Sequence, residues 1–387
     1  YLMIRILHIV TNIYDPEKTT KENIGGLEIQ TYRLIKKLTE KGILVDIISL
    51  NKLYKTNNRI NCYIPKKNKG IFKMFHLFIE CIKLLAQGEY SIVHVHANGG
   101  LFPIIISLIS KLVFKNTTIN TFHCCRNITY KARPIEFFVK TLINYLEKQC
   151  IRKSDFNVFL SELVLDKLKK KNIIKTFSKN IVIGDAIDVK NCPHQDVMSK
   201  KIVFIGRISH EKGWNIFLEC AKKLKHKDYE FIMYGGGPEE KKLRKKIDRY
   251  KLENFHYYGI IKNEDVREVL LKSKIVVIPS IYEELGSVVL EAGMMKKTVI
   301  ASNVGALKEI LADGRGVLVK MGEIDEFCLR INEEMNSLNT QKGELLYQYV
   351  HNNFSLDDIS EKYLSVYNSA INSIKNQAGK AIKKGKV

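Results

Sequence analysis

The feature that most constrains the fold of this chain is a repeated alternation of short apolar runs, rich in Val and Ile, with longer segments of helical periodicity. Leu27, Leu34 and Leu38, which lie between the first two runs, are spaced for one face of a helix. This alternation predicts a parallel sheet covered by helices, because parallel neighbours need a crossover connection, usually helical and right-handed. In the first half of the chain the runs fall at residues 4–10, 45–49, 92–96, 118–122, 157–160 and 181–183.

The pattern restarts after a polar segment, residues 188–200, which contains Pro193 and shows no clear period. A chain of 387 residues also exceeds what one hydrophobic core usually organises. We therefore predict an α/β protein with two doubly wound, Rossmann-like domains, residues 1–190 and 200–354, and a ligand at the carboxyl ends of the strands, in the cleft between the domains. The second series of runs falls at residues 202–205, 231–233, 255–258, 275–278, 298–301 and 317–319.

Two further segments follow the second domain. Residues 355–375 repeat apolar side chains at helical spacing, including Ile359, Tyr363 and Val366, and predict one long helix. Residues 376–387 are rich in Lys, and we expect this basic tail to be disordered.

The formal net charge of +22 predicts a negatively charged partner, either nucleic acid, anionic lipid or a phosphorylated substrate. Lysines occur in nearly every polar segment, which is also typical of a lysine-rich genome. Nucleic acid is the least favoured partner, because the chain lacks a basic stretch interleaved with aromatic residues and any known reader module.

The cysteines and the apolar stretches limit the class of protein further. None of the 8 cysteines forms a CxxC pair, so we expect reduced thiols and no zinc site. The apolar start lacks a basic n-region, and no apolar stretch reaches the ~20 residues that span a bilayer, so neither a signal peptide nor a membrane span is expected.

The strongest motif lies at residues 279–292, after an apolar run and at the start of a helical pattern. The first amides of a helix that begins near Gly286 can face a diphosphate. Glu291, about one turn into that helix, can accept hydrogen bonds from a ribose, and Glu283 can address the hydroxyls of a transferred sugar. Three neighbouring residues complete the predicted donor loop: Leu285, Ser287 and Val288.

A second motif, residues 206–213, places Arg207 and Lys212 directly after a predicted strand. Two fixed positive charges can stabilise a departing nucleotide diphosphate when no metal does so. No two aspartates are separated by one residue, so the DxD motif of metal-clamped sugar nucleotides is missing. We therefore predict neither a metal nor another cofactor.

Two glycine turns and a histidine complete the candidate site. Gly235 and Gly236 follow a strand of the second domain, and Gly25 and Gly26 precede the first helix, so both turns allow backbone to approach a nucleotide or its phosphates. The first-domain turn lacks the GxGxxG fingerprint, which argues against a dehydrogenase. His123 ends a predicted strand and is a candidate contact to sugar or acceptor; His94 and His96 are expected to end the neighbouring strand.

Together these motifs resemble those of glycosyltransferase family 4, which are retaining enzymes of the GT-B fold. Further motifs carry the likeness at Glu28, at residues 305–309 and in the closing helical segment. The resemblance implies that this helix returns to the first domain. It also implies that Arg207 and Lys212 hold the donor diphosphate, Glu291 the ribose and Glu283 the sugar, with His123 at the catalytic centre.

The resemblance also implies a reaction. A hexose or N-acetylhexosamine would pass from a nucleotide diphosphate sugar, with UDP favoured over GDP, to a glycan or lipid-linked acceptor in bacterial cell-envelope polysaccharide synthesis. Glu284, Leu285 and residues 184–188 depart from the family pattern, which bears on sugar identity. The alternative is a nucleotide-sugar epimerase, or another GT-B enzyme, that acts without a glycan acceptor.

A basic segment in the first domain raises the question of a membrane. Residues 66–69 carry three lysines and precede an amphipathic stretch at 71–78. One hypothesis is that this segment contacts anionic lipid at the inner leaflet, which implies a cytoplasmic enzyme that is peripheral on the membrane. The other is a core helix with a lysine-rich outer face. The sequence leaves both open.

Overall fold

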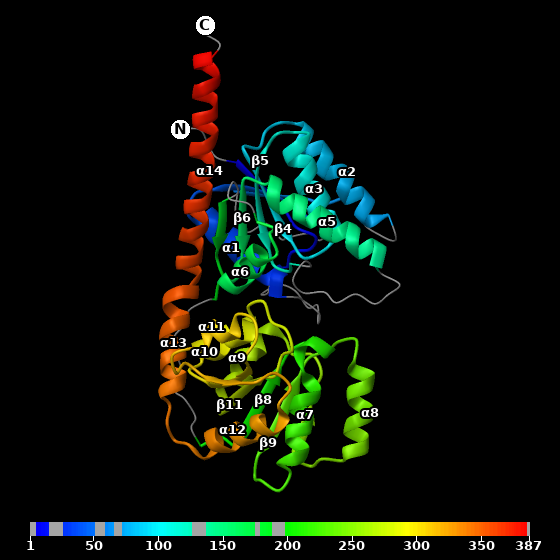
Figure 1. The fold of residues 1–387 in the computed structure, drawn as a ribbon, viewed down its shortest axis with the longest axis vertical. Coiled ribbons are helices and arrows are strands. Elements are labelled where there is room, and N and C mark those ends of the chain that lie inside the picture. The colour runs from blue at the N-terminus through cyan, green and yellow to red at the C-terminus, as the bar shows by residue number, and fades with distance from the viewer. Residues whose placement is uncertain are drawn as a thin grey trace. The chain divides into compact units, whose positions relative to one another are not determined.

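The computed structural model describes residues 5–14, 26–50, 59–65, 72–125, 137–174, 179–187 and 198–384. The chain forms two compact units (Figure 1). The first comprises residues 1–15, 25–186 and 356–387, and the second comprises residues 16–24 and 187–355. Gly25, residues 66–69 of the basic segment, and residues 188–197 of the predicted interdomain segment lie outside the described residues.

The first unit contains a parallel sheet of seven strands in the order β3-β2-β1-β4-β5-β6-β7. The order reverses between β1 and β4, and ligands bind doubly wound sheets at such a point. β3 is the only strand of this sheet that the sequence does not predict, because it is a short edge strand with polar Asn61 in it. The strands are β1 (Arg5–Ile9), β2 (Leu44–Ile48), β3 (Ile60–Tyr63), β4 (Ile92–Ala97), β5 (Thr117–Phe122), β6 (Phe156–Phe159) and β7 (Lys179–Val182).

The alternation of side chains along β1 assigns its two faces to different helices. Ile6 belongs to a core cluster with residues of α1 and α14, whereas Leu7 packs with residues of α2 and α3. Residues of even number in β1 and β4 therefore face α1 and α14. The described helices of this unit are α1 (Gly26–Glu40), α2 (Lys73–Ala86), α3 (Leu101–Leu112), α5 (Phe137–Lys153), α6 (Glu162–Lys170) and α14 (Leu356–Lys384).

The last helix of the chain, α14, is part of the first unit, where it contacts α1 and β4 (Figure 1). Its buried stripe includes Ile359, Tyr363 and Tyr367. The prediction of a disordered tail from residue 376 is wrong for residues 376–384, which continue the helix. Ala, Lys and Gln dominate this stretch and favour helix, and they outweigh its single glycine.

The second unit contains a parallel sheet of six strands in the order β10-β9-β8-β11-β12-β13, with its reversal between β8 and β11. All six strands are predicted by the sequence. They are β8 (Lys201–Ile205), β9 (Glu230–Tyr234), β10 (Phe255–Tyr257), β11 (Ile275–Ile278), β12 (Thr298–Ser302) and β13 (Val317–Val319). The helices are α7 (Trp214–Lys223), α8 (Glu240–Tyr250), α9 (Asn263–Leu271), α10 (Ser287–Met294), α11 (Leu307–Ile310), α12 (Ile324–Asn336) and α13 (Gln341–Phe354), with a short 3₁₀ turn η2 (His210–Lys212).

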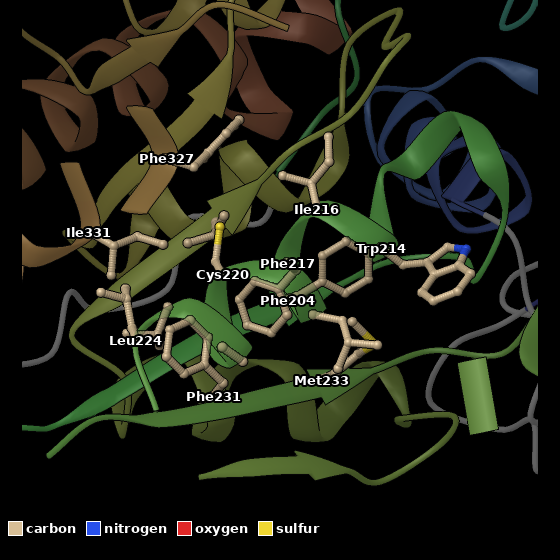
Figure 2. Close-up of a cluster of buried hydrophobic side chains, with 14 of the residues drawn as sticks. Phe204, Trp214, Ile216, Phe217, Cys220, Leu224, Phe231, Met233, Phe327 and Ile331 are labelled. Carbon is tan, nitrogen blue, oxygen red and sulfur yellow. The ribbon is translucent and has the colours of Figure 1, made fainter. Parts of the chain in front are cut away.

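Aromatic packing fixes α7 on this sheet (Figure 2). Phe217 of α7 is fully buried, and its ring contacts those of Phe204 in β8 and Phe231 in β9. Trp214, the first residue of α7, is also buried. The loop between β8 and α7 is thereby anchored at both of its ends.

The fold class predicted from the sequence, two Rossmann-like parallel-sheet domains, is confirmed. Among the described residues, no helix is both long enough and apolar enough to cross a membrane.

Candidate active site

The loops at the carboxyl ends of β8, β9 and β11 are in direct backbone contact. Gly213 has a φ of +68°, and a Cβ there would lie 1.9 Å from the carbonyl oxygen of Pro279. Gly235 has a φ of +139°, and its Cβ would lie 1.8 Å from the carbonyl oxygen of Gly206. Only glycine fits either position, so these glycines allow the loops to meet.

The loop after β12 joins them through Gly305. This residue has a φ of +54°, and a Cβ would lie 1.6 Å from the carbonyl oxygen of Glu283. The loops that follow β8 and β12 therefore both contact residues 279–283 after β11, and the loop after β9 contacts the loop after β8.

Glu283 and Lys212 form a close ion pair, although 71 positions separate them. Lys212 Nζ donates to both carboxylate oxygens, at 2.8 and 2.7 Å, and Ser280 Oγ donates to Oε2 at 3.2 Å. Glu283 is 8% exposed, so this pair is largely shielded from solvent. An ammonium group has three N–H donors, so Lys212 can bind an anionic oxygen while it still holds Glu283.

Arg207 lies on the same loop as Lys212 and pairs with Glu211. Ser209 Oγ also donates to Glu211 Oε1, at 2.7 Å. Burial raises the pKa of the Glu211 carboxyl, but the hydrogen bonds from Ser209 and Arg207 outweigh it, so that the net pKa is lowered. The backbone carbonyl of Glu211 accepts from the amide of Ile281 at 2.8 Å, which ties the two motifs together. Glu211 is not among the predicted site residues.

The remaining predicted donor residues of this unit lie at strand ends or at the start of α10. Gly286 precedes α10 with a φ of +87°, and Ser287 and Val288 form the first turn, where backbone amides lack intrahelical acceptors. Glu291 is the fifth residue of this helix and is partly buried. Leu285 is buried, and Gly235 and Gly236 follow β9.

In the first unit, the structure corrects the expected positions of two histidines. His123 directly follows β5, as predicted, but β4 continues to Ala97, so His94 and His96 lie inside the strand and are fully buried. Both have even numbers and so face α1 and α14. His8 in β1 pairs in register with His94, and it is a site residue that the sequence prediction misses.

Three of these histidines, His8, His96 and His123, form a hydrogen-bonded row. His8 Nδ1 lies 3.1 Å from His96 Nε2, and His96 Nδ1 lies 3.2 Å from His123 Nε2. Burial lowers the pKa of His8 to about 3 and that of His123 to about 4, and the pKa values of His94 and His96 fall well below the ordinary range for the same reason. All four rings are therefore neutral at neutral pH.

A buried carboxyl group lies at the His123 end of this row. Asp185 Oδ1 is 3.8 Å from His123 Nδ1. Burial raises the pKa of Asp185 to about 7, although the charge of Arg33 acts in the opposite direction. Asp185 follows β7, the edge strand of its sheet, and it belongs to residues 184–188, which depart from the family pattern. Gly26 opens α1, and Gly25 lies outside the described residues.

The fold and the family models together identify the class of protein, a glycosyltransferase with the GT-B fold. Residues 24–190 match the family model described as Glycosyltransferase Family 4, and residues 190–342 match that of Glycosyl transferases group 1. The chain belongs to glycosyltransferase family 4, as its motifs indicate.

Individual proteins extend this likeness over most of the chain. The 2-deoxystreptamine N-acetyl-D-glucosaminyltransferase of Niallia circulans is 26% identical over 331 residues, which are 77% of this chain and 85% of that protein. The sucrose-phosphate synthase of Thermosynechococcus elongatus superposes with a TM-score of 0.82 at 17% identity, covering 96% of this chain and 100% of that one. Alr3699/HepE of Anabaena in complex with UDP-glucose superposes with a TM-score of 0.73 at 16% identity, covering 95% and 100%. The two structural likenesses show the fold.

Gly305→Ala should destabilise the protein more than Gly322→Ala. Both glycines have a positive φ, +54° and +86°, so alanine is strained at either position, at a cost of about 1–2 kcal/mol. Only at Gly305 does the new Cβ meet backbone, that of Glu283, whereas nothing lies within 4 Å at Gly322. Thermal unfolding of both variants measures the difference. Equal destabilisation would contradict the tight contact between these two loops.

Because these histidines are buried, we predict that the free energy of unfolding falls as the pH drops from about 6.5 to about 5. The rings stay neutral in the folded protein, because their pKa values are lowered, while the unfolded chain takes up protons in this window. The unfolded chain therefore binds more protons, and the free energy of unfolding falls by about 1.4 kcal/mol per pH unit for each excess proton. Urea unfolding at a series of pH values measures this slope.

Asp185→Asn provides the control for this slope. Because the pKa of Asp185 is raised from 3.8 to about 7, the folded protein holds a proton there that the unfolded chain lacks, which opposes the effect of the histidines. The variant removes that opposition, so its stability should fall more steeply with acid. If stability stays constant or rises toward pH 5 in both proteins, the histidines are not buried as neutral rings.

Proposed function

We propose that this enzyme transfers a hexose or N-acetylhexosamine from a nucleotide diphosphate sugar to a glycan or lipid-linked acceptor, with retention of configuration and without a metal. The contact between Lys212 and Glu283 carries the proposal, because it places a cation for phosphate beside a carboxylate for sugar hydroxyls. The name of the Niallia circulans relative supports an N-acetylhexosamine donor, and the UDP-glucose complex of HepE supports UDP over GDP. Bacterial cell-envelope polysaccharide synthesis is the process we infer from the family resemblance.

The donor diphosphate would lie against the loops at the carboxyl ends of β8 and β11. Arg207 and Lys212 supply positive charge there, and the first amides of α10 supply N–H donors and the positive end of a helix dipole. Such fixed charges stabilise a leaving diphosphate as a metal ion would, and they need no reorganisation during the reaction. Glu291 of α10 would bind the ribose.

Glu283 would hold the sugar rather than attack it. Its two oxygens are bound by Lys212 and Ser280, and its backbone is held by Gly305, so the carboxylate is fixed in orientation. In the proposed reaction the bond from the anomeric carbon to the diphosphate breaks, and the acceptor oxygen bonds to that carbon on the same face. The acceptor hydroxyl proton passes to an oxygen of the departing diphosphate, so no protein nucleophile is needed. His123 would contact the sugar or acceptor.

The donor prediction concerns Lys212, Arg207 and Glu291. UDP-sugars should raise the thermal unfolding temperature in EDTA, and GDP-sugars should do so less. Lys212→Met and Arg207→Ala should each lower kcat/KM by roughly 100-fold, the loss typical of removing one group that stabilises developing charge. Glu291→Ala should abolish the thermal shift. Lys245→Ala, an exposed lysine on α8, is the matched control and should behave like the wild type.

Two outcomes would contradict this proposal. If the folded protein responds to no nucleotide sugar, the loops do not form a donor site. If it converts a nucleotide sugar into its epimer with no acceptor present, the enzyme is a nucleotide-sugar epimerase and the proposed transfer is refuted.

We also propose that the first unit contacts an anionic membrane surface through α2. Phe72 and Phe75 are 67% and 59% exposed, and they lie three positions apart, on neighbouring parts of the helix surface. In the sequence Lys73 lies between them and follows the lysines of residues 66–69 by four positions. Aromatic side chains beside basic ones suit the boundary between headgroups and acyl chains.

Sedimentation with vesicles tests this contact. The wild-type protein should pellet with anionic vesicles at low salt and should be released as the salt concentration rises. Phe72→Ser/Phe75→Ser should remain in the supernatant, whereas Leu338→Ser, which removes an equally exposed side chain from the second unit, should still pellet. If the wild-type protein does not pellet, the membrane contact is refuted.

A further inference from the structure

The buried histidines of the first unit belong to a longer chain of polar side chains, which ends at α14. Beyond His8, the hydroxyl of Tyr367 lies 3.4 Å from His8 Nε2 and 2.8 Å from His94 Nδ1. His94 Nε2 in turn lies 2.8 Å from Thr121 Oγ1, which is 3.0 Å from the hydroxyl of Tyr363. The complete order is Asp185, His123, His96, His8, Tyr367, His94, Thr121 and Tyr363.

The four rings are arranged head to tail in this chain. In each ring Nδ1 faces the side of Asp185 and Nε2 faces the side of Tyr363. The rings of His8 and His96, and those of His96 and His123, are each only 25° from parallel, which suits in-plane contacts between ring nitrogens. One side contact branches from the chain, where Thr31 Oγ1 lies 3.4 Å from His96 Nδ1.

A metal ion is the other ligand that such a cluster suggests, since ring nitrogens of His8, His94 and His96 all lie within 4.8 Å of one another. The ring geometry does not favour it. The lone pair of an imidazole nitrogen lies in the ring plane, and His94 and His96 are stacked face to face, with centroids 4.3 Å apart and planes 26° from parallel. Their lone pairs therefore do not converge on one point. Every nitrogen of these three rings also has a hydrogen-bond partner already.

Counting donors shows that the bonds of the chain depend on one another. A neutral imidazole has one N–H donor and one acceptor nitrogen, and a hydroxyl has one donor. When one ring donates from Nδ1, the next ring toward Asp185 must accept at Nε2. The single proton of that ring is then on Nδ1, from which it donates in turn. The chain therefore has two complete arrangements, one with all four rings protonated at Nδ1 and one with all four protonated at Nε2.

We propose that these side chains form a proton relay with two collective states, and that the charge on Asp185 selects between them. An ionised carboxylate only accepts hydrogen bonds, so it favours the Nδ1–H form of His123 and, through His96, His8 and Tyr367, that of His94. A neutral carboxyl group, 3.8 Å from His123 Nδ1, does not impose this preference and permits the Nε2–H state. In the conversion each bridging proton between Tyr363 and His123 crosses its own hydrogen bond, one proton is taken up at the Tyr363 end, and the proton released from His123 Nδ1 passes to Asp185, 3.8 Å away.

The surroundings of Asp185 place this conversion near neutral pH. Among the described residues, Arg33 of α1, His123 after β5 and Tyr363 of α14 are titratable or charged groups that interact with it. Arg33 favours the ionised form, whereas burial favours the neutral form and is the larger effect. Both states of the carboxyl group are therefore populated in the range where the enzyme is expected to work.

The two states differ in what His123 presents beside the end of β5. In the Nδ1–H state its Nδ1, which faces Asp185 at 3.8 Å, is a hydrogen-bond donor, and in the Nε2–H state the same nitrogen is an acceptor. The use of this difference on a sugar or acceptor hydroxyl rests on the proposed function. The relay itself does not, and it is tested in the protein without any substrate.

The test is a tautomer measurement on the full chain labelled with ¹⁵N-histidine. Two-bond ¹H–¹⁵N correlation spectra distinguish a protonated ring nitrogen from a bare one, and individual His→Gln variants assign the signals. At pH 8.5 we expect His8, His94, His96 and His123 all to be protonated at Nδ1. In Asp185→Asn all four should lose this preference together, whereas the exposed His351 should not change.

Tyr367→Phe tests the connection, because it removes the hydroxyl between His8 and His94. In the double variant with Asp185→Asn, the change should reach His8 and stop there, and His94 should no longer respond. Mixed tautomers in the wild-type protein, or a response to Asp185→Asn confined to His123, would overturn the relay. If Asp185→Asn does not fold, titration of the wild-type protein around pH 7 gives the same readout, with one shared midpoint expected for the four rings.

Discussion

Parallel strand pairing is the constraint on which both candidate sites depend. In each sheet every strand runs in the same direction, so the segments that follow the strands meet at one edge. Lys212 and Glu283 are far apart in sequence, yet β8 and β11 are hydrogen-bonded neighbours, and the loops that follow them lie in contact. The same pairing aligns His8 with His94 in the first unit. Each unit therefore builds its site from neighbouring strands at the reversal of its strand order.

Close backbone approach then fixes the loops of the proposed donor site. A carbonyl oxygen occupies the space of a Cβ at Gly213, Gly235 and Gly305, so these loops meet without a side chain between them. Glycine costs conformational entropy on folding. That cost is offset where a carboxylate must hold one orientation, and Glu283 takes part directly in the contact with Gly305.

Much of this architecture can be predicted from the sequence, because strands that are buried on both faces consist of continuous apolar runs. The predicted cations Arg207 and Lys212 and the carboxylate of Glu283 also lie on contacting loops. β3 is missed because an edge strand needs no such run, and His94 and His96 are misplaced because a strand end cannot be located to within one or two residues from periodicity. Asp185 and His8 cannot be recognised in this way, since their importance comes from partners on other strands.

The buried polar chain has an energetic consequence for the role of α14. Burying polar groups is costly unless their hydrogen bonds are made, and apolar side chains in the same space would avoid that cost. Tyr363 and Tyr367 of α14 supply the hydroxyls that satisfy His94 and Thr121, so the last helix completes a network that begins in the first strand. A shift of α14 would leave the neutral rings without these hydrogen bonds. In a region of low dielectric, each missing hydrogen bond has its largest cost in free energy. The network therefore specifies one position of α14 on its sheet. The apolar stripe of the helix alone would specify that position less strictly, because aliphatic packing is not directional.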